Sequence, residues 1–145
     1  MKFMIKTFQE LTTEELYEIL KVRAEVFVVE QNCVYQDLDE KDKNSIHVFF
    51  EKDGKIHAYL RIFMKNPEEK LAQIGRVLTT ARGTGVGIRI LREGLAAAKE
   101  YLKAREVCIE AQCYAVGFYE KAGFRVTSDE FMEDGIPHVE MRTLL

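Results

Sequence analysis

Residues 71–102 read LAQIGRVLTTARGTGVGIRILREGLAAAKEYL, the most informative pattern in the chain. The apolar segment from Leu71 to Thr79 predicts a strand. A glycine-rich run, Arg82-Gly83-Thr84-Gly85-Val86-Gly87, follows that segment. Beyond this run, apolar residues recur at the spacing of one helix face: Ile88, Leu91, Leu95, Ala98 and Leu102. The segment therefore predicts a strand, a glycine loop and a long helix in succession.

The glycine loop predicts an anion-binding site. Gly83, Gly85 and Gly87 allow backbone conformations that other residues avoid, and they place no Cβ in the way of a ligand. The N–H groups of the loop and of the first helical turn would converge on a pyrophosphate, helped by the helix dipole. The alternative is a tight strand-to-helix turn that binds nothing. The dinucleotide fingerprint would need glycine in place of Ile88, and the Walker sequence is absent, so these two nucleotide-binding classes are excluded.

Length, composition and charge narrow the class of protein. The chain has 145 residues, 47% of them apolar, which predicts one globular domain over residues 1–145. No apolar run approaches the ~20 residues of a membrane span, and charges interrupt the amino-terminal segment, so we expect a cytoplasmic protein without a signal peptide. The net charge of −3 argues against a general nucleic-acid or membrane surface. Three cysteines without a C-x-x-C pair argue against a disulfide frame or a metal site.

The first half of the chain predicts a helix and a hairpin. Thr12 and Glu15 form a capping box that starts the helix, and its end lies at an undetermined point within Val26 to Val29. From Ser45 the apolar period changes to two, and Asp53-Gly54 predicts a turn between antiparallel strands.

The second half adds shorter elements. Val107 to Ala111 predicts a buried strand, and a short helix follows that Gly123 stops. Asp134-Gly135 predicts a turn before a last strand, Pro137 to Thr143. The order α-β-β-β-α-β-α-β-β predicts an α+β or mixed α/β domain, with helices packed on one largely antiparallel sheet.

Two motifs resemble the GNAT superfamily of N-acetyltransferases. Residues 82–87 match its acyl-CoA-binding signature, Q/R-x-x-G-x-G/A. Downstream, Gly117-Phe118-Tyr119-Glu120-Lys121-Ala122-Gly123-Phe124 is similar to the superfamily's F-Y-E-K-x-G-F segment. A likeness to the ElaA-type branch extends over nearly the whole chain, in Arg23 to Cys33, Tyr35-Gln36, Asp39, Asp42, Gly75-Arg76-Val77, Ala111-Gln112 and Gly135 to His138.

The resemblance implies a fold in which the strand Leu71 to Leu78 splays in a V from the strand Val107 to Ala111. The pantetheine arm of coenzyme A would lie in that gap, with its pyrophosphate on the loop. Backbone N–H groups of Val77 to Thr79 would polarise the carbonyl of acetyl-CoA. The implied cofactor-binding residues are Val77, Leu78, Thr79, Arg82, Gly83, Thr84, Gly85, Val86, Gly87, Gln112 and Tyr119.

Tyr119 is the implied general acid, from its position in the second motif. A reference tyrosine titrates near ~10 and a thiol near ~8.5, so complete proton donation to the thiolate is uphill by about 2 kcal/mol. We therefore expect Tyr119 mainly to hydrogen-bond the leaving sulfur. The alternative is a tyrosine that only packs its ring into the core.

The general base has several candidates. Glu30 follows an apolar run, and Glu110 lies in the strand Val107 to Ala111. His47 and His138 lie in predicted strands and titrate in a useful range, so we expect them near the acceptor substrate. For each of these four residues a structural role is the alternative, and water could relay the proton instead.

Other polar residues carry weaker predictions. Cys108 and Cys113 fit small buried side chains better than nucleophiles. Three cations could reach coenzyme A phosphates or simply face solvent: Arg89, Arg92 and Lys121. The run Asp37-Leu38-Asp39-Glu40 could attract a cationic acceptor, or form a solvated loop.

Together these features predict an acetyl-CoA-dependent N-acetyltransferase acting on a primary amine by direct attack in a ternary complex. The acceptor can be a small molecule or a protein amino group. The sequence also leaves open whether the protein forms a homodimer. A non-catalytic acyl-CoA-binding or sensing module is the second hypothesis. A domain that binds another phosphate-bearing nucleotide is the third.

Overall fold

A single twisted sheet organises the domain. The computed structural model describes residues 1–81 and 83–145. In these residues eight strands form the sheet in the order β1-β2-β3-β4-β5-β8-β6, with β7 paired to β8. Its pairs are antiparallel except β4 with β5, which are parallel. The strands are β1 (Met4–Thr7), β2 (Ile46–Lys52), β3 (Lys55–Asn66), β4 (Leu71–Thr79), β5 (Glu106–Gln112), β6 (Arg125–Val126), β7 (Phe131–Glu133) and β8 (Ile136–Leu144). The predicted α+β class and its largely antiparallel sheet are confirmed.

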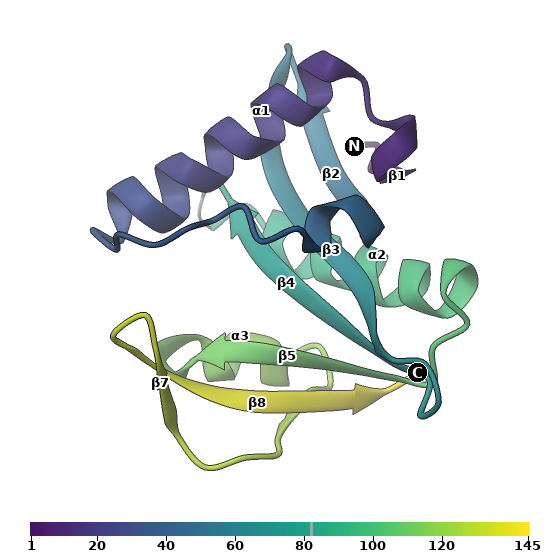
Figure 1. Cartoon of the computed structure of the whole chain (residues 1–145), viewed down its shortest axis with the longest axis vertical. Helices are drawn as coiled ribbons and strands as arrows, with labels where there is room; N and C mark the ends of the chain where they lie inside the picture. Colours follow the sequence, from purple (N-terminus) through teal and green to yellow (C-terminus); the bar gives the residue numbers. More distant parts are fainter. Residues whose placement is uncertain (82) are drawn as a thin grey trace.

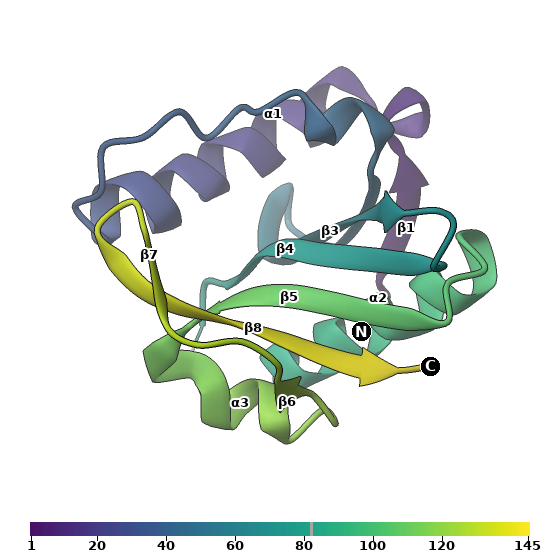
Figure 2. The same cartoon turned by 60° about the horizontal axis from the view of Figure 1, so that its bottom comes forward.

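Helices cover both faces of this sheet. They are α1 (Thr13–Arg23), α2 (Val86–Tyr101) and α3 (Val116–Glu120), and a π-helical segment, Ala24–Glu30, continues α1. Short 3-10 turns lie at Phe8–Glu10, Lys41–Asn44 and Cys113–Ala115. Figure 2 shows α1 on one side of the sheet and α3 on the other. None of the helices described here is long and apolar enough to cross a membrane.

The hairpin strand β3 is buried on both faces, and its alternating residues belong to two cores. Leu60 and Ile62 pack in the core beneath α2, together with Ile90 and Leu91 of that helix. Tyr59 faces the opposite way, into a smaller core beneath α1. Because side chains alternate across a strand, one apolar strand can hold a helix on each face.

Local sequence explains how the helices begin and end. The predicted capping box is present, because Thr12 Oγ1 accepts from the Glu15 N–H at 3.1 Å and the Glu15 carboxylate accepts from the Thr12 N–H at 2.9 Å. The β-branched run whose end was undetermined adopts the π-helical segment and continues to Glu30. Gly123, at φ +97, lies in the turn after α3, where a residue with a Cβ would be strained.

Two details differ from the predicted pattern. The edge strand β1 is absent from it, because four residues, of which three are half-buried and Thr7 is exposed, give too short an alternation to detect. The buried stripe of α2 is also rotated from the predicted one. It is centred on Ile90, Leu91, Gly94 and Ala98, whereas Ile88 is only half-buried. The rotation follows from the close approach of Gly94 to Leu60 of β3.

Candidate functional site

The strands β4 and β5 separate part-way along their length. Their parallel pairing runs from Leu71 with Glu106 to Ile74 with Ile109 and then stops. Beyond that point β4 stays paired with β3, and β5 stays paired with β8 as far as Gln112 with His138. Figure 1 shows the resulting V, with β4 above and β5 below. The predicted splay between these two strands is confirmed.

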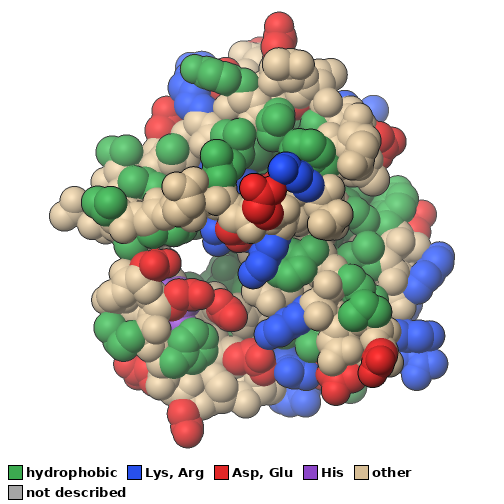
Figure 3. Space-filling model, in the orientation of Figure 1, with side chains coloured by type: hydrophobic (Ala, Val, Ile, Leu, Met, Phe, Trp, Pro, Cys, Tyr) green, Lys and Arg blue, Asp and Glu red, His purple; other side chains and the backbone are tan. Residues whose placement is uncertain are grey.

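A cavity of about 400 Å³ occupies the separation. One wall comes from β3 and β4, through Arg61, Gly75 and Val77, and the opposite wall comes from β5, α3 and β8. The segment after the π-helix roofs it with Gln31, Cys33 and Tyr35. Figure 3 shows the hollow between the two halves of the molecule, with acidic side chains gathered along its lower rim.

A bulge in β4 shapes the first wall. Tyr59 pairs with Leu78 and Arg61 with Gly75, so Leu60 alone faces both Arg76 and Val77. Arg76 adopts φ +54, and this left-handed residue kinks the strand where the two strands part. Of the residues predicted to polarise a thioester, Val77 therefore lies in the bulge and lines the cavity. Leu78 and Thr79 remain in register with β3.

The glycine loop joins β4 to α2. Gly83 and Gly85 adopt φ +74 and +76, and a Cβ added to either would meet no atom within 4 Å. These two glycines therefore serve the backbone conformation and leave the space outside it free. Gly87 differs, because an added Cβ would lie 3.3 Å from the Phe118 ring of α3. The predicted ligand Arg82 lies outside the described residues.

Thr84 and Val86 complete the entry into α2. The Thr84 hydroxyl donates to the carbonyl of Ala81 at 3.3 Å, and the Val86 N–H donates to that hydroxyl at 3.5 Å. Gly85 is the N-cap residue, so the amino end of a 16-residue helix opens at this loop. Such an end carries unpaired N–H groups and a positive dipole, both of which favour an anion.

Tyr119 lies on α3 and lines the cavity. Only 9% of it is exposed, and its ring packs edge-on against Phe118 and Phe124. Burial raises its pKa, and the neighbouring Tyr114 adds to the rise, so the phenol stays protonated. Its hydroxyl is therefore a hydrogen-bond donor at the cavity, and outright proton release is harder than from an ordinary tyrosine.

A pair of amides spans the cavity. Gln31, at the end of the π-helical segment, and Gln112, at the end of β5, exchange two side-chain hydrogen bonds of 3.3 Å. The predicted cofactor residue Gln112 is thus held in place by a partner 81 positions away in sequence. Nothing in the local sequence around Gln31 signals this pairing.

Acidic residues and a histidine form the far wall. Glu110 of β5 and His138 of β8, both predicted site residues, line the cavity together with Glu133 of β7. His138 Nε2 is 3.5 Å from Glu133 Oε2. Burial raises the pKa of Glu133, and the neighbouring Glu110 adds to the rise. Glu133 carries no recognisable signal in the sequence, because it lies in a polar hairpin that resembles an exposed turn.

The other two candidates for the base and the acceptor site lie elsewhere. Glu30 is exposed at the end of the π-helical segment and is not among the described residues that line the cavity. His47 is fully buried beneath α1, where its ring nitrogens contact the Tyr59 hydroxyl at 2.7 Å and the Asp42 carbonyl at 2.9 Å. Burial lowers its pKa. The expectation that His47 meets the acceptor is not supported, because its polar atoms are already satisfied within the protein.

The acidic run after Val34 has a different role from either prediction. Asp37, Asp39 and Asp42 pair with three arginines from separate elements, which are Arg23, Arg61 and Arg76. Asp42 lies between Arg23 at 2.6 Å and Arg61 at 2.9 Å. Three carboxylates and three guanidinium groups cancel, so this network is neither a solvated loop nor a free anionic surface. It anchors the roof of the cavity to β3 and β4.

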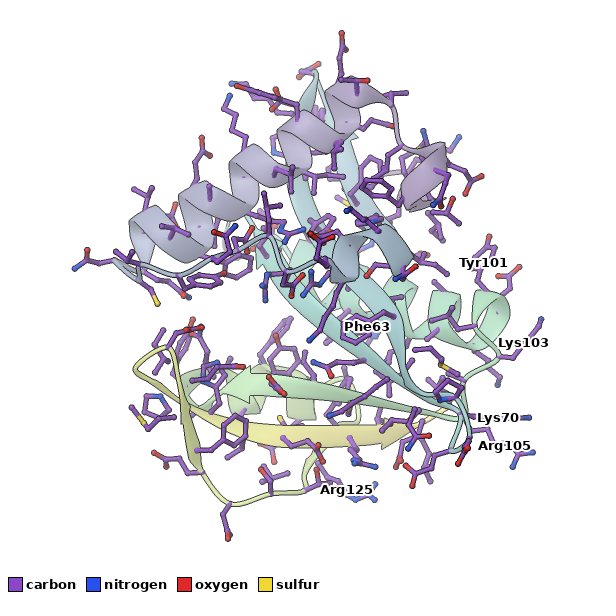
Figure 4. All side chains as sticks on the ribbon, in the orientation of Figure 1. Phe63, Lys70, Tyr101, Lys103, Arg105 and Arg125 are labelled. Atoms are coloured by element: carbon purple, nitrogen blue, oxygen red, sulfur yellow. The ribbon has the colours of Figure 1, made fainter. Side chains whose placement is uncertain are left out.

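Lysine and arginine side chains lie both at the cavity and at the closed end of the V. Lys41 lies at the cavity, with its Nζ 5.3 Å from the ring centre of Phe63, and Figure 4 marks Phe63 on β3. Lys70, Lys103 and Arg105 lie together at the closed end of the V. Arg89, Arg92 and Lys121 are all exposed. In the described part of the chain, no group of His, Cys, Asp or Glu side chains is arranged to hold a metal ion.

The cysteines differ in their surroundings. Cys108 is fully buried in β5, and burial raises the pKa of its thiol, as expected for a small core side chain. Cys113 is half-buried. Cys33 lines the cavity, and its thiol donates to the Asp134 carbonyl at 3.4 Å, which links the roof to the β7–β8 turn.

Comparison with known proteins agrees with this geometry. A family model described as an acetyltransferase (GNAT) domain matches residues 8–145. The chain belongs to the GNAT family. This GNAT chain is 37% identical over 146 residues to a UPF0039 protein of Schizosaccharomyces pombe, covering 98% of this chain and 96% of the relative.

Solved structures give the same result. An acyl-CoA N-acyltransferase from Pseudomonas aeruginosa is 35% identical, with a TM-score of 0.89 over 99% of both chains. The crystal structure of Escherichia coli ElaA is 32% identical, with a TM-score of 0.89 over 98% of both chains. The resemblance to the ElaA branch is thereby confirmed, and this GNAT protein is an acyl-CoA N-acyltransferase in fold and family.

Proposed function

We propose that this GNAT protein transfers an acetyl group from acetyl-CoA to a primary amine by direct attack in a ternary complex. The observation that carries the proposal is the cavity at the separation of β4 and β5, which is lined by Tyr119 of α3, Glu110 of β5 and His138 of β8. An acyl donor and an amine can meet there directly, and the fully buried thiol of Cys108, whose pKa burial raises, is a poor nucleophile for an acyl-enzyme.

The donor would be held by backbone groups more than by side chains. Gly83 and Gly85 keep the loop open on its outer side, and the amino end of α2 favours a pyrophosphate. The edges of β4 and β5 that face each other beyond Ile74 and Ile109 are free of mutual pairing. They can therefore hydrogen-bond an extended amide-containing arm, as a neighbouring strand would.

The chemistry requires a polarised carbonyl and a stabilised leaving thiolate. The N–H of Val77 in the bulge is our candidate donor to the thioester carbonyl. Tyr119 donates a hydrogen bond to the leaving sulfur. Full proton transfer from an ordinary tyrosine to an ordinary thiolate is uphill by about 2 kcal/mol, and the raised pKa of Tyr119 makes it more unfavourable still.

The acceptor site carries negative charge, although not from the run proposed on sequence grounds. Arginines neutralise Asp37, Asp39 and Asp42, whereas Glu110, Glu133 and Asp134 line the cavity from β5 and the β7–β8 hairpin. These carboxyl groups favour an amine that arrives protonated. We therefore propose a cationic acceptor, either a small molecule or a protein amino group, that is attracted by the carboxyl groups on the opposite wall of the cavity.

Thiol release from acetyl-CoA in the presence of an amine panel tests the proposal. We expect Tyr119→Phe to lower kcat at least tenfold while coenzyme A binding, measured by calorimetry, stays within about twofold. Tyr101→Phe is the matched control, because Tyr101 is exposed on α2 and we expect wild-type rates from it. Normal coenzyme A binding with no turnover on a broad panel would favour a non-catalytic acyl-CoA-binding module instead.

A further inference from the structure

The cavity wall formed by β3 contains a buried hydrogen-bond donor without a partner. Arg61 is 3% exposed and lines the cavity. Its Nη1 and Nη2 atoms donate to the carboxylates of Asp39 and Asp42 at distances from 2.6 to 2.9 Å. Its Nε, in contrast, is the one buried side-chain nitrogen or oxygen in the described part of the chain that has no hydrogen-bond partner. Because an unpaired buried N–H group is costly and rare, this donor indicates an acceptor atom that comes from outside the chain.

Gly75 of β4 leaves space beside this donor. It lies directly opposite Arg61 in the strand pairing, and it also lines the cavity. A glycine inside a strand marks a bulge or a close approach by a ligand, and here the left-handed residue of the bulge is Arg76, so the backbone of Gly75 does not require a glycine. Apart from chain neighbours, a Cβ at Gly75 would meet only Arg61 Nε, at 3.9 Å. The glycine therefore keeps a space open next to the unpaired N–H.

A second cation lies on the same wall. Lys41 lines the cavity with its Nζ 5.3 Å from the ring centre of Phe63, and the guanidinium carbon of Arg61 is 5.8 Å from the same ring centre (Figure 4 labels Phe63). Among the described residues, the ion pairs of this wall are those of the aspartate–arginine network and of Glu40 with Lys43, and Lys41 joins none of them. The three carboxylates and three guanidinium groups of the network cancel, so Lys41 gives this wall a net positive charge.

The opposite wall has the opposite sign. Glu110, Glu133 and Asp134 line the cavity from β5 and the β7–β8 hairpin. The volume of about 400 Å³ lies toward the lower end of the roughly 300–1,000 Å³ that is usual for small-molecule sites. A small molecule that complements both walls carries an ammonium group at one end and an anion at the other.

We propose that the acceptor is a small zwitterionic amine, an amino acid or a similar aminocarboxylate, whose carboxylate is bound by the Arg61 Nε–H and the Lys41 ammonium group. This inference rests on the proposed function and names the class of its acceptor. The pantetheine arm of the donor carries no charge and does not compete for this wall. In the transfer, the acceptor nitrogen bonds to the acetyl carbon and the C–S bond breaks. The ammonium group gives one proton to the leaving thiolate and one to solvent, while the carboxylate is unchanged.

Pairs of acceptors that differ only in the anion test the inference. Glycine, β-alanine, γ-aminobutyrate and L-lysine are each compared with their own carboxamide, with rates expressed per concentration of neutral amine, because a carboxylate raises the pKa of a nearby ammonium group. The wild type should use its best amino acid at least tenfold better in kcat/KM than the matching amide, as expected for the loss of one charge-assisted hydrogen bond. Equal use of amino acids and amides would overturn the inference and leave the proposed function intact.

Two variants then assign the preference to this wall. Lys41→Gln and Gly75→Ala should each lower the carboxylate-to-amide ratio at least fivefold, with the KM for acetyl-CoA within twofold of wild type. Gly75→Ala fills the space beside Nε and leaves Arg61 bound to Asp39 and Asp42, whereas replacing Arg61 would also break that network. Lys43→Gln is the matched control, because Lys43 lies in the same 3-10 turn, pairs with Glu40 and is not among the described residues that line the cavity. A ratio that is unchanged in both test variants would overturn the inference.

A binding measurement separates the inference from the proposed function. In nitrogen–proton NMR spectra of the wild type with coenzyme A, at least one of the same four amino acids should shift the assigned Nε–H signal of Arg61, and its amide should not. The Gly75→Ala variant should lose that shift. No shift with any of the four would overturn the inference whatever the activity, whereas the expected shift without turnover of any acceptor would refute the proposed function and keep the carboxylate site.

Discussion

Asp42 is the central anion of the network that holds the cavity roof, and Asp42→Asn should destabilise the whole domain. Asp42 accepts from Arg23 at 2.6 and 3.2 Å and from Arg61 at 2.9 Å. Arg23 is 0% exposed and Arg61 is 3% exposed. Asparagine has nearly the same shape, so the substitution opens no cavity. It removes the charge and turns an amide N–H₂ toward one of two buried guanidinium groups.

The expected size of the effect follows from what the arginines retain. Removing one partner of a buried ion pair typically costs 3–5 kcal/mol, roughly the penalty of the charge left behind. Arg23 keeps Asp37, and Arg61 keeps Asp39. The loss should therefore lie at the lower end, about 3 kcal/mol. For a chain of this length that loss lowers Tm by about 10 °C.

Urea unfolding followed by circular dichroism at neutral pH measures this loss directly. Glu40→Gln is the matched control, because Glu40 pairs with Lys43 in the same 3-10 turn but its side chain is 80% exposed. The control should change the free energy of unfolding by less than about 0.5 kcal/mol. A loss below about 1 kcal/mol for Asp42→Asn, or equal losses in the two variants, would refute the view that this network stabilises the fold.

Three further outcomes follow from the same structure. Burial opposes ionisation of Asp39, but hydrogen bonds from Arg61 outweigh it and lower the pKa of Asp39 to about 2, so its contribution to stability should be full above about pH 4 and fall as pH drops toward 2. In acid-unfolding curves Asp39→Asn should flatten that fall, and an unchanged slope would contradict the assignment. Gly94→Ala would place a Cβ 2.9 Å from Leu60 Cδ2, and overpacking should outweigh the gain in helix propensity by about 1 kcal/mol in urea unfolding. Gly117→Ala, with no atom within 4 Å, is its control, and equal stabilities would show that β3 yields to α2. Buried Cys108, with its raised pKa, should resist thiol reagents in the folded protein while Cys33 reacts, and rapid labelling of Cys108 would contradict the packed state of β5.

Local sequence was sufficient wherever the signal depends on neighbours in the chain. The capping box of Thr12 and Glu15, the Asp53-Gly54 turn and the strand–loop–helix order around residues 71–102 all satisfy backbone groups within a few positions. Hydrophobic periodicity then assigns these elements to strands and helices. The motifs on β4, α2 and α3 also indicated the family.

The register of the strands and the burial of their side chains could not be predicted from local sequence. The difference between His47 and His138 shows why, since both lie in strands and have similar chemistry. One faces the core beneath α1 and the other faces the cavity, because their strands pair at different places in the sheet. The bulge at Arg76 depends likewise on the register of β4 with β3.

The sequence by itself determined the elements, their order and the glycine loop that opens α2, because these rest on short-range hydrogen bonding and on the absence of Cβ atoms. Only the tertiary structure decided which charges cancel and which remain. The arginines that neutralise Asp37, Asp39 and Asp42 come from α1, β3 and β4, and the carboxyl that joins Glu110 at the cavity, Glu133, comes from β7. Electrostatic interactions act through space, so the character of the cavity appears only when these distant segments are packed together.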